Sequence, residues 1–228
     1  CMRCESDKPM KNGGWLHKSE SYIAPVRYIK PEPPIERPRC TALLSDWAQR
    51  TETGRLLDFA AKLGVDAIAL RMLGCVWAQE HNAWAFPMRN GNGVTVGIRV
   101  RNEAGDKWAV KGSKQGLFYS LTKLPGTLYI VEGPTDTAAG LTLGLNTVGR
   151  PSCRGCEDSV IRLVERLSPP GIVIVADNDI PGQQGAFTLQ QRLPGALVWT
   201  PPAKDLREFV KLGGTRQIVE AMTKDLRA

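Results

Sequence analysis

The chain lacks a long hydrophobic stretch. No apolar run approaches the ~18 residues that a membrane-spanning helix needs, and the charged-then-apolar pattern of a secretion signal does not occur at the N-terminus. We therefore expect no membrane association and a cytoplasmic location. The sequence also lacks the Gly-x-x-x-x-Gly-Lys-Ser/Thr phosphate loop of helicases, so a helicase would have to be a partner or a segment outside these residues.

Cysteine and histidine, the usual zinc ligands, are scarce, with six and two residues among 228. A closed zinc site takes four such ligands, and segment 1–24 offers the pair Cys1 and Cys4. We interpret this segment as half of a zinc ribbon whose other half precedes residue 1, so that the chain is a piece of a longer protein; the alternative is a pair without function. For the second pair, Cys153 and Cys156, free thiols are favoured over a zinc site shared with the first pair.

Acidic residues are outnumbered by basic ones, 23 against 30, which gives a formal net charge of +7. Such a bias favours an anionic partner, most often nucleic acid, over a merely basic soluble protein. The chain is long enough, and with 42% hydrophobic residues apolar enough, to bury a core of one to two domains.

The first half of the chain is predicted to contain a linker and a small mixed subdomain. Five prolines within 25–41 predict an extended linker. Apolar residues at spacings of three and four then predict short helices within 42–74. Alternating strands around the turn Asn90-Gly91-Asn92-Gly93 predict an antiparallel sheet, with strands at 84–89, 94–101 and 107–111. We assign residues 42–124 to this α+β subdomain.

Basic side chains are concentrated in this predicted sheet. Arg99 and Arg101 share one strand face, and Lys107, Lys111 and Lys114 follow soon after. One strand can thus present a row of cations to a phosphate backbone. The alternative is an ordinary solvated strand face.

Residues 125–228 alternate strand and helix patterns, which predicts an α/β domain. The expected strands are 128–131, 146–148, 171–176 and 196–199, and the expected helices are 135–143, 158–167, 185–193, 206–212 and 217–226. Such alternation predicts a parallel sheet covered by helices on both faces, with its functional site at the carboxyl ends of the strands.

Carboxylates stand at two of these strand ends. Glu132 follows the first strand, and Asp177 and Asp179 follow the third. Their shared negative charge requires a neutralising cation, for which Mg²⁺ is the natural choice, since it binds a few carboxylates and fills its remaining positions with water and substrate phosphates. Mn²⁺ is the alternative ion. The pattern therefore predicts metal-dependent phosphoryl transfer on a polyphosphate.

Two motifs of this region resemble the TOPRIM signature of bacterial and phage primases, topoisomerases and some nucleases. They are Glu132-Gly133-x-x-Asp136 and Asp177-x-Asp179-x-x-Gly182. The half ribbon, the linker, a helical and antiparallel subdomain that ends in the stretch 108–118, and the later Pro202-Ala203-Lys204-Asp205 are similar in order to bacterial-type DNA primases and to the primase halves of phage primase-helicases. The resemblance implies a TOPRIM parallel sheet flanked by helices, preceded by a small primase subdomain.

The resemblance also implies roles for individual residues. Glu132 would be a metal ligand or general acid/base, with Asp177 and Asp179 holding Mg²⁺. Two accessory acids, Asp136 and Asp205, would complete a second metal position. The family often carries another acid two places after Asp205, where this chain has Arg207, and this departure leaves a second metal in question. Lys111 and Lys114 match the basic stretch that contacts nucleotide and template in the family. Together with the basic residues of the predicted sheet and the later Lys204, they make up the predicted nucleotide- and DNA-binding set: Arg99, Arg101, Lys107, Lys111, Lys114 and Lys204.

The implied function is DNA replication: short RNA primers made from ribonucleoside triphosphates on single-stranded DNA, with a replicative helicase as a further partner, in a phage, a mobile element or a cell. The alternatives are a TOPRIM metal-dependent nuclease and a non-catalytic module that binds single strands or recruits a helicase. A topoisomerase is disfavoured because none of the four tyrosines lies in a winged-helix context. For Asp136, stabilisation of its own helix by charge is an alternative to metal binding.

Overall fold

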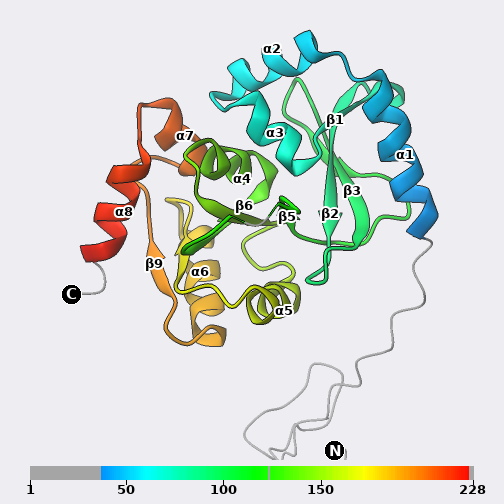
Figure 1. Ribbon diagram of the computed structural model, residues 1–228. Coiled ribbons are helices and arrows are strands. Elements are labelled where there is room, and N and C mark those ends of the chain that lie inside the picture. The colour runs from blue at the N-terminus through cyan, green and yellow to red at the C-terminus, as the bar shows by residue number, and fades with distance from the viewer. Residues whose placement is uncertain (1–36, 123, 226–228) are drawn as a thin grey trace, which may run out of the picture. The chain divides into compact units, whose positions relative to one another are not determined.

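A computed structural model describes residues 37–122 and 124–225. The predicted ribbon segment with Cys1 and Cys4, and all but the end of the predicted linker, lie outside these residues. Within the described part the chain forms two sheets and their covering helices (Figure 1). None of the helices in this part is both long enough and apolar enough to cross a membrane.

The first sheet is antiparallel, as the hairpin signal predicted, and has the strand order β1-β2-β3-β4. Its strands are β1 (Val76–Ala78), β2 (Ala83–Arg89), β3 (Thr95–Asn102) and β4 (Lys107–Ala109), with a short 3₁₀ turn η1 (Gln79–His81). Its helices are α1 (Arg37–Arg50), α2 (Thr53–Leu63) and α3 (Ala67–Leu73). All of β2 is buried because helices cover both faces of this strand.

The second sheet has the order β5-β7-β6-β8-β9. Its strands are β5 (Phe118–Tyr119), β6 (Leu128–Glu132), β7 (Asn146–Arg150), β8 (Ile172–Val175) and β9 (Leu197–Trp199). Its helices are α4 (Gly133–Thr142), α5 (Glu157–Leu167), α6 (Ile180–Arg192), α7 (Leu206–Lys211) and α8 (Arg216–Asp225). Strands β6 to β9 pair in parallel, as predicted, and β5 is the only described strand of this second sheet that joins antiparallel.

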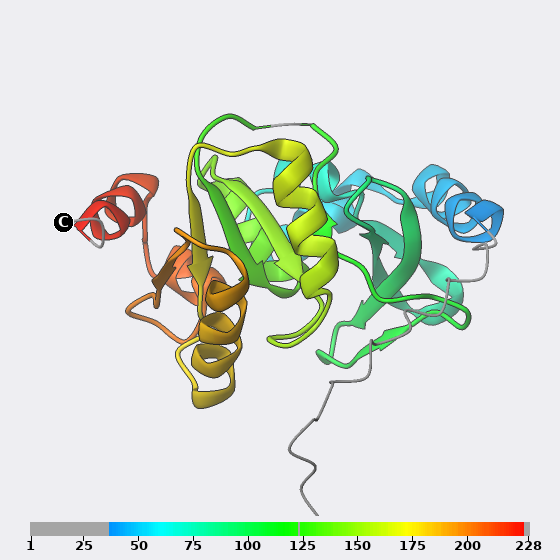
Figure 2. The same cartoon turned by 90° about the horizontal axis from the view of Figure 1, so that it is seen from below.

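Alternate residues of β6 point to opposite faces of this sheet, as a strand covered on both sides requires. Leu128 and Ile130 pack with α5 and α6, whereas Tyr129 and Val131 pack with α4 and α7. Figure 1 shows α4 and α7 on one side of β6, and Figure 2 views the sheet from the side of α5 and α6. The α/β fold class with helices on both faces is confirmed.

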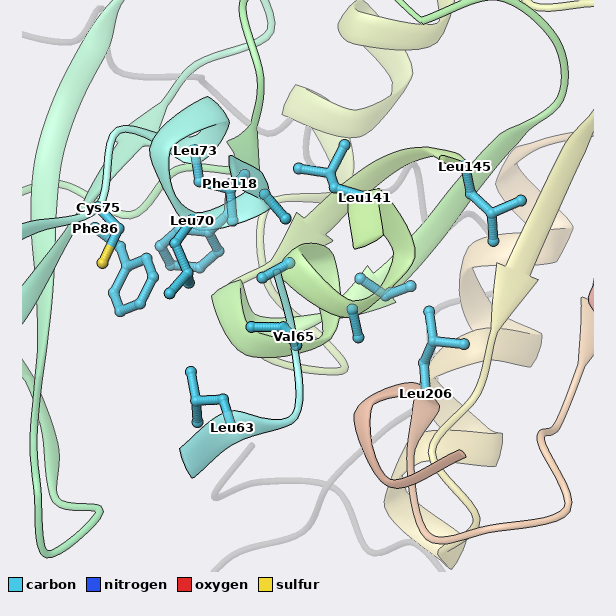
Figure 3. Packing of buried hydrophobic residues seen from close by; sticks show 14 of the residues in the cluster. Leu63, Val65, Leu70, Leu73, Cys75, Phe86, Phe118, Leu141, Leu145 and Leu206 are labelled. Carbon is cyan, nitrogen blue, oxygen red and sulfur yellow. The ribbon is translucent and has the colours of Figure 1, made fainter. Parts of the chain in front are cut away.

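One hydrophobic core joins the two sheets. It includes Phe86 of the first sheet, Phe118 and Tyr129 of the second, and residues of α2, α3, α4 and α7. Figure 3 shows Phe86 and Phe118 in this core beside leucines of the helices. Phe59 stacks on Trp84, with ring centroids 4.5 Å apart and an interplanar angle of 9°. Because the same cluster supports both sheets, residues carried by the first can be held at a fixed place against the second.

Several elements differ from prediction: β1 and β5 were not predicted, and helices such as α1 and α6 begin earlier than expected. Helix α1 begins at Arg37, inside the expected linker, because a proline such as Pro38 is tolerated in a first turn, where its missing N–H has no helical partner. Helix α6 begins at Ile180, five residues early, because Asp179 caps it. Strand β5 was not predicted, since two residues carry no periodicity. It pairs with β7 across the domain boundary expected between residues 124 and 125. The division into a subdomain at 42–124 and an α/β domain at 125–228 remains a prediction.

Candidate active site

Five carboxylates converge on one cavity of ≈ 430 Å³ at the carboxyl ends of the parallel strands. Glu132 ends β6, and Asp177 and Asp179 follow β8. Asp136 comes from the first turn of α4, and Asp205 from the residue before α7. The structure therefore brings together all the acidic residues that the sequence singled out.

Backbone hydrogen bonds fix three of these carboxylates. The side chain of Asp179 caps α6 by accepting a hydrogen bond from the Gly182 N–H at 2.7 Å. Asp205 caps α7 by accepting from the Glu208 N–H, also at 2.7 Å. Asp136 Oδ1 accepts from the Arg207 N–H at 2.9 Å. One oxygen of each carboxylate is thus held by the fold, which orients the group before any ligand arrives.

Glycines allow the backbone turns that bring these acids together. Gly133 has a φ of 73°, in the left-handed region that favours glycine, directly after Glu132. On the neighbouring strand, a Cβ at Gly149 would lie 2.5 Å from the Gly133 carbonyl oxygen. The turn after β6 is therefore pressed against β7, and this contact fixes where Glu132 leaves the sheet.

The cavity carries more negative charge than its surroundings neutralise. Burial and then repulsion by Asp205 raise the pKa of Asp136 to about 7. Burial, followed by repulsion from Glu132, Asp205 and Asp179, raises the pKa of Asp177 to about 7 as well, with only Lys204 opposing. Burial also raises the pKa of Glu132, against the attraction of Arg150. Carboxylates in this state gain from a bound cation.

The five carboxylates are suitable ligands for Mg²⁺ or Mn²⁺, because both ions prefer oxygen ligands and these carboxylate oxygens repel one another around the cavity. Among the described residues, no three Asp, Glu, His or Cys side chains are already arranged as a complete metal site. The remaining ligands would then be water and substrate oxygens, as is usual for Mg²⁺.

Four cationic residues line the same cavity. Arg101 and Lys107 come from β3 and β4 of the first sheet, and Lys204 and Arg207 from the segment around the start of α7. Repulsion from Arg207 adds to burial in lowering the pKa of Arg101, while Asp136 and Asp205 oppose the effect. The cavity is therefore a place where positive and negative groups face one another, which suits a ligand with phosphates and a metal ion.

The other basic residues predicted for nucleic-acid binding stand apart from this cavity. Arg99, Lys111 and Lys114 are not among its lining residues. Arg99 lies on β3 two residues before Arg101, and Lys111 is exposed. The structure thus divides the predicted basic set, with Arg101, Lys107 and Lys204 at the carboxylates and the other three outside.

Sequence reasoning missed Arg150. It ends β7 directly beside Glu132 in the parallel register, and its side chain is buried at 2% exposure. Its Nε and Nη1 have no hydrogen-bond partner among the described residues. Only the pairing of β7 with β6 reveals this neighbour, because eighteen residues of sequence separate the two and no motif links them. Pro151 and Ser152, which follow, line the cavity.

The four described cysteines, Cys40, Cys75, Cys153 and Cys156, are free thiols. The preference for free thiols over a zinc site at Cys153 and Cys156 stays a prediction, because the other two expected ligands of such a site lie outside the described residues. Whether Cys1 and Cys4 hold zinc stays a prediction.

Comparisons with known proteins point to one class of fold. No family model matches the sequence. The chain is 26% identical over 151 residues to the Gene 57 protein of Mycobacterium phage D29, which covers 64% of this chain and 97% of that protein.

Several solved primase structures share the fold. The DnaG catalytic core superposes with a TM-score of 0.64 at 14% identity, over 82% of this chain and 79% of that one. A DnaG primase catalytic domain bound to single-stranded DNA gives a TM-score of 0.60 at 15% identity, over 81% and 76%. The primase fragment of the bacteriophage T7 primase-helicase gives 0.56 at 20% identity, over 71% and 72%. The chain has the fold of these catalytic cores, as the motifs predicted.

Proposed function

We propose that this chain is a DNA primase that joins ribonucleoside triphosphates into short RNA primers on single-stranded DNA. The proposal rests on one observation: in a primase-core fold, five carboxylates and four cationic residues line a single cavity at the strand ends. The primase domain bound to single-stranded DNA and the T7 primase-helicase, which have this fold, support a single-strand template and a helicase partner.

The reaction forms a bond between the 3′ oxygen of one nucleotide and the α-phosphorus of another, while the bond to pyrophosphate breaks and the 3′ hydroxyl loses its proton. Mg²⁺ or Mn²⁺ bound to Glu132, Asp177 and Asp179 would supply the positive charge that such a phosphoryl transfer needs. The protein's own contribution is to keep these carboxylates in place: Asp179 through its helix cap, and Glu132 through the turn after β6.

The cationic side of the cavity supports binding of the triphosphate. Arg101, Lys107 and Lys204 line the same cavity as the acids, so they would bind oxygens of a triphosphate whose charge is also balanced by an ion at the carboxylates. Arg99, Lys111 and Lys114 are proposed to contact the template backbone outside the cavity, where contacts are sequence-independent. We also propose that Cys1 and Cys4 belong to a zinc ribbon that selects the template, and that the protein acts in the cytoplasm of a phage-infected or other cell.

The experiment is primer synthesis on single-stranded templates with labelled ribonucleotides, comparing Asp177→Ala with the exposed-site control Asp58→Ala. Asp177→Ala is expected to lower synthesis on the order of 100-fold or more, because it removes a carboxylate that positions the metal. Asp58, on the exposed face of α2, should be replaceable without effect. Normal synthesis by Asp177→Ala would refute the proposal.

The same samples test the rival functions. Metal-dependent cleavage of labelled DNA in the absence of nucleotides would favour a nuclease. Tight single-strand binding that ignores metal, without any primer, would favour a non-catalytic module.

A further inference from the structure

The loop between β7 and α5 carries a cysteine pair that the proposed reaction does not use. Cys153 and Cys156 are separated by two residues, and both are half-buried free thiols. The Gly155 N–H donates to the Ser152 carbonyl at 3.1 Å, so the chain turns back within this loop and shortens the path between the two thiols. Cys-x-x-Cys spacing is typical of pairs that form and break a disulfide.

A buried cation lies beside the same loop. Arg150, which ends β7, is 2% exposed, and its Nε and Nη1 have no hydrogen-bond partner among the described residues. Burial lowers the pKa of Arg150, and two acids and both thiols of the pair oppose this effect. The two sulfur atoms therefore lie near one guanidinium. A cation beside a thiol favours the thiolate, which is the form that attacks a disulfide.

The second thiol also stands at the start of a helix. Cys156 is the N-cap residue of α5, where the positive end of the helix dipole favours a negative charge. The two acids of the first turn, Glu157 and Asp158, are paired with Arg192 at 2.9 and 2.7 Å, so part of their charge is balanced. Burial raises the pKa of Cys156, and Arg150 opposes this effect. The spacing, the cation and the helix start are three features typical of reactive cysteine pairs.

The loop is also part of the candidate active site. Pro151 and Ser152, which line the cavity of the five carboxylates, come directly before Cys153. A Cβ at Gly185 would lie 2.7 Å from the Cys153 Cβ, so the loop is pressed against α6, the helix that Asp179 caps. Because this contact leaves no free space, a new bond that pulls on Cys153 would move the cavity wall or the start of α6.

We propose that Cys153 and Cys156 form a reversible disulfide that lowers primer synthesis. Its effect rests on the proposed function, whereas the bond itself can be measured without it. The oxidant is a small-molecule disulfide such as oxidised glutathione. One protein thiolate attacks a sulfur atom of the oxidant, and a glutathione thiolate leaves. The other protein thiolate then attacks the mixed disulfide, and the second glutathione leaves. The protein pair thus loses two electrons and two protons, and the oxidant becomes two thiols.

Peptide mapping detects the bond. The protein is reduced, treated with a zinc chelator, equilibrated with oxidised glutathione, alkylated and digested with trypsin. Trypsin cleaves after Arg154, between the two cysteines, so the disulfide joins two peptides, 124–154 and 155–162, that are otherwise separate. We expect joined peptides after oxidation and separate peptides after dithiothreitol.

Primer synthesis is measured on the same samples. The oxidised wild type should lose synthesis on the order of tenfold and recover it with dithiothreitol, because a misplacement of ~1 Å near the reacting groups can cost ~100-fold. The double variant Cys153→Ser/Cys156→Ser should keep its activity in oxidised glutathione. The control Cys40→Ser removes another half-buried thiol, on α1, and should remain as sensitive as the wild type.

The possible outcomes are distinct. Separate peptides in oxidised glutathione would overturn the proposal, as would joined peptides with unchanged synthesis or an equal loss in the double variant. No synthesis by the reduced wild type would refute the proposed function, while peptide mapping would still decide whether the disulfide exists. Circular dichroism checks that the double variant folds. If it does not, the oxidised wild type decides, since a loss that dithiothreitol does not reverse would count against the disulfide.

Discussion

Replacing Asp136 by Asn should make the metal-free protein more stable at alkaline pH. The carboxyl of Asp136 is buried, and its pKa is raised from the usual 3.8 to about 7 by burial and by Asp205. Asparagine has the same shape and no charge, and its side-chain oxygen can still accept the hydrogen bond from the Arg207 N–H. The substitution therefore removes the cost of a buried charge while keeping the contact that the carboxylate makes.

The magnitude follows from the proton linkage. A pKa that is higher in the folded chain than in the unfolded chain means that the folded chain holds the proton more tightly. The contribution of Asp136 to the free energy of unfolding of the wild type is then largest below the usual pKa of 3.8, falls as the pH rises, and levels off above about pH 7. At ~1.4 kcal/mol per pH unit, the loss amounts to about 4 kcal/mol by pH 8 and about 1.5 kcal/mol by pH 5.

The assay is urea unfolding in EDTA at pH 5 and pH 8, followed by tryptophan fluorescence, since Trp77, Trp84 and Trp199 are buried. The stability gain of Asp136→Asn over the wild type should be about 2.5 kcal/mol larger at pH 8 than at pH 5. The exposed-site variant Asp58→Asn should show no such difference. An equal gain for Asp136→Asn at both pH values would mean that Asp136 is not a buried acid with a raised pKa, and would refute the reasoning.

Three further substitutions test the scaffold of the site. Gly149→Ala places a Cβ 2.5 Å from the Gly133 carbonyl oxygen, so it should lower the free energy of unfolding in urea by about 1–3 kcal/mol and reduce primer synthesis. The control is Gly54→Ala, where the new methyl group meets nothing within 4 Å. Equal stability and activity of the two variants would contradict the close packing of Gly149 on Gly133. Asp179→Ser keeps a side-chain cap on α6, so its free energy of unfolding should stay within about 0.5 kcal/mol of the wild type, whereas Asp179→Ala should lose about 1 kcal/mol. Both variants should lose Mn²⁺ binding, measured by electron paramagnetic resonance of the free ion. If either variant still binds Mn²⁺, Asp179 is not a ligand of the metal site. Phe59→Ala should cost about 3–5 kcal/mol in the same unfolding assay, and a loss below about 1 kcal/mol would mean that the Trp84 stack is dispensable.

The sequence contained the main features of the second sheet and its site. Apolar runs with β-branched residues predicted β6 and β8, because a strand covered on both faces has no polar side. Since parallel strands end at the same edge, Glu132 and Asp177 were predicted to lie near each other without any knowledge of the strand order. Local pattern was sufficient here because the relevant contacts follow from the direction of the chain.

The features that escaped prediction depend on contacts between distant segments. β5 is too short to carry a pattern, and it exists because β7 offers an edge for pairing. Arg150 is beside Glu132 only because β7 pairs with β6. The basic residues could be identified from the sequence, but which of them line the cavity depends on how the core joins the two sheets.

By itself, the sequence determined that this protein has a parallel α/β domain with carboxylates at its strand ends, because hydrophobic periodicity and chain direction are local properties. Only the tertiary structure decided how the charges are partnered. Arg207 lies 71 residues after Asp136 in the sequence, yet its backbone N–H donates a hydrogen bond to the Asp136 carboxylate. Its guanidinium contacts Asp205. Charge partners in a buried site are set by burial and distance in space, and neither can be read from spacing along the chain.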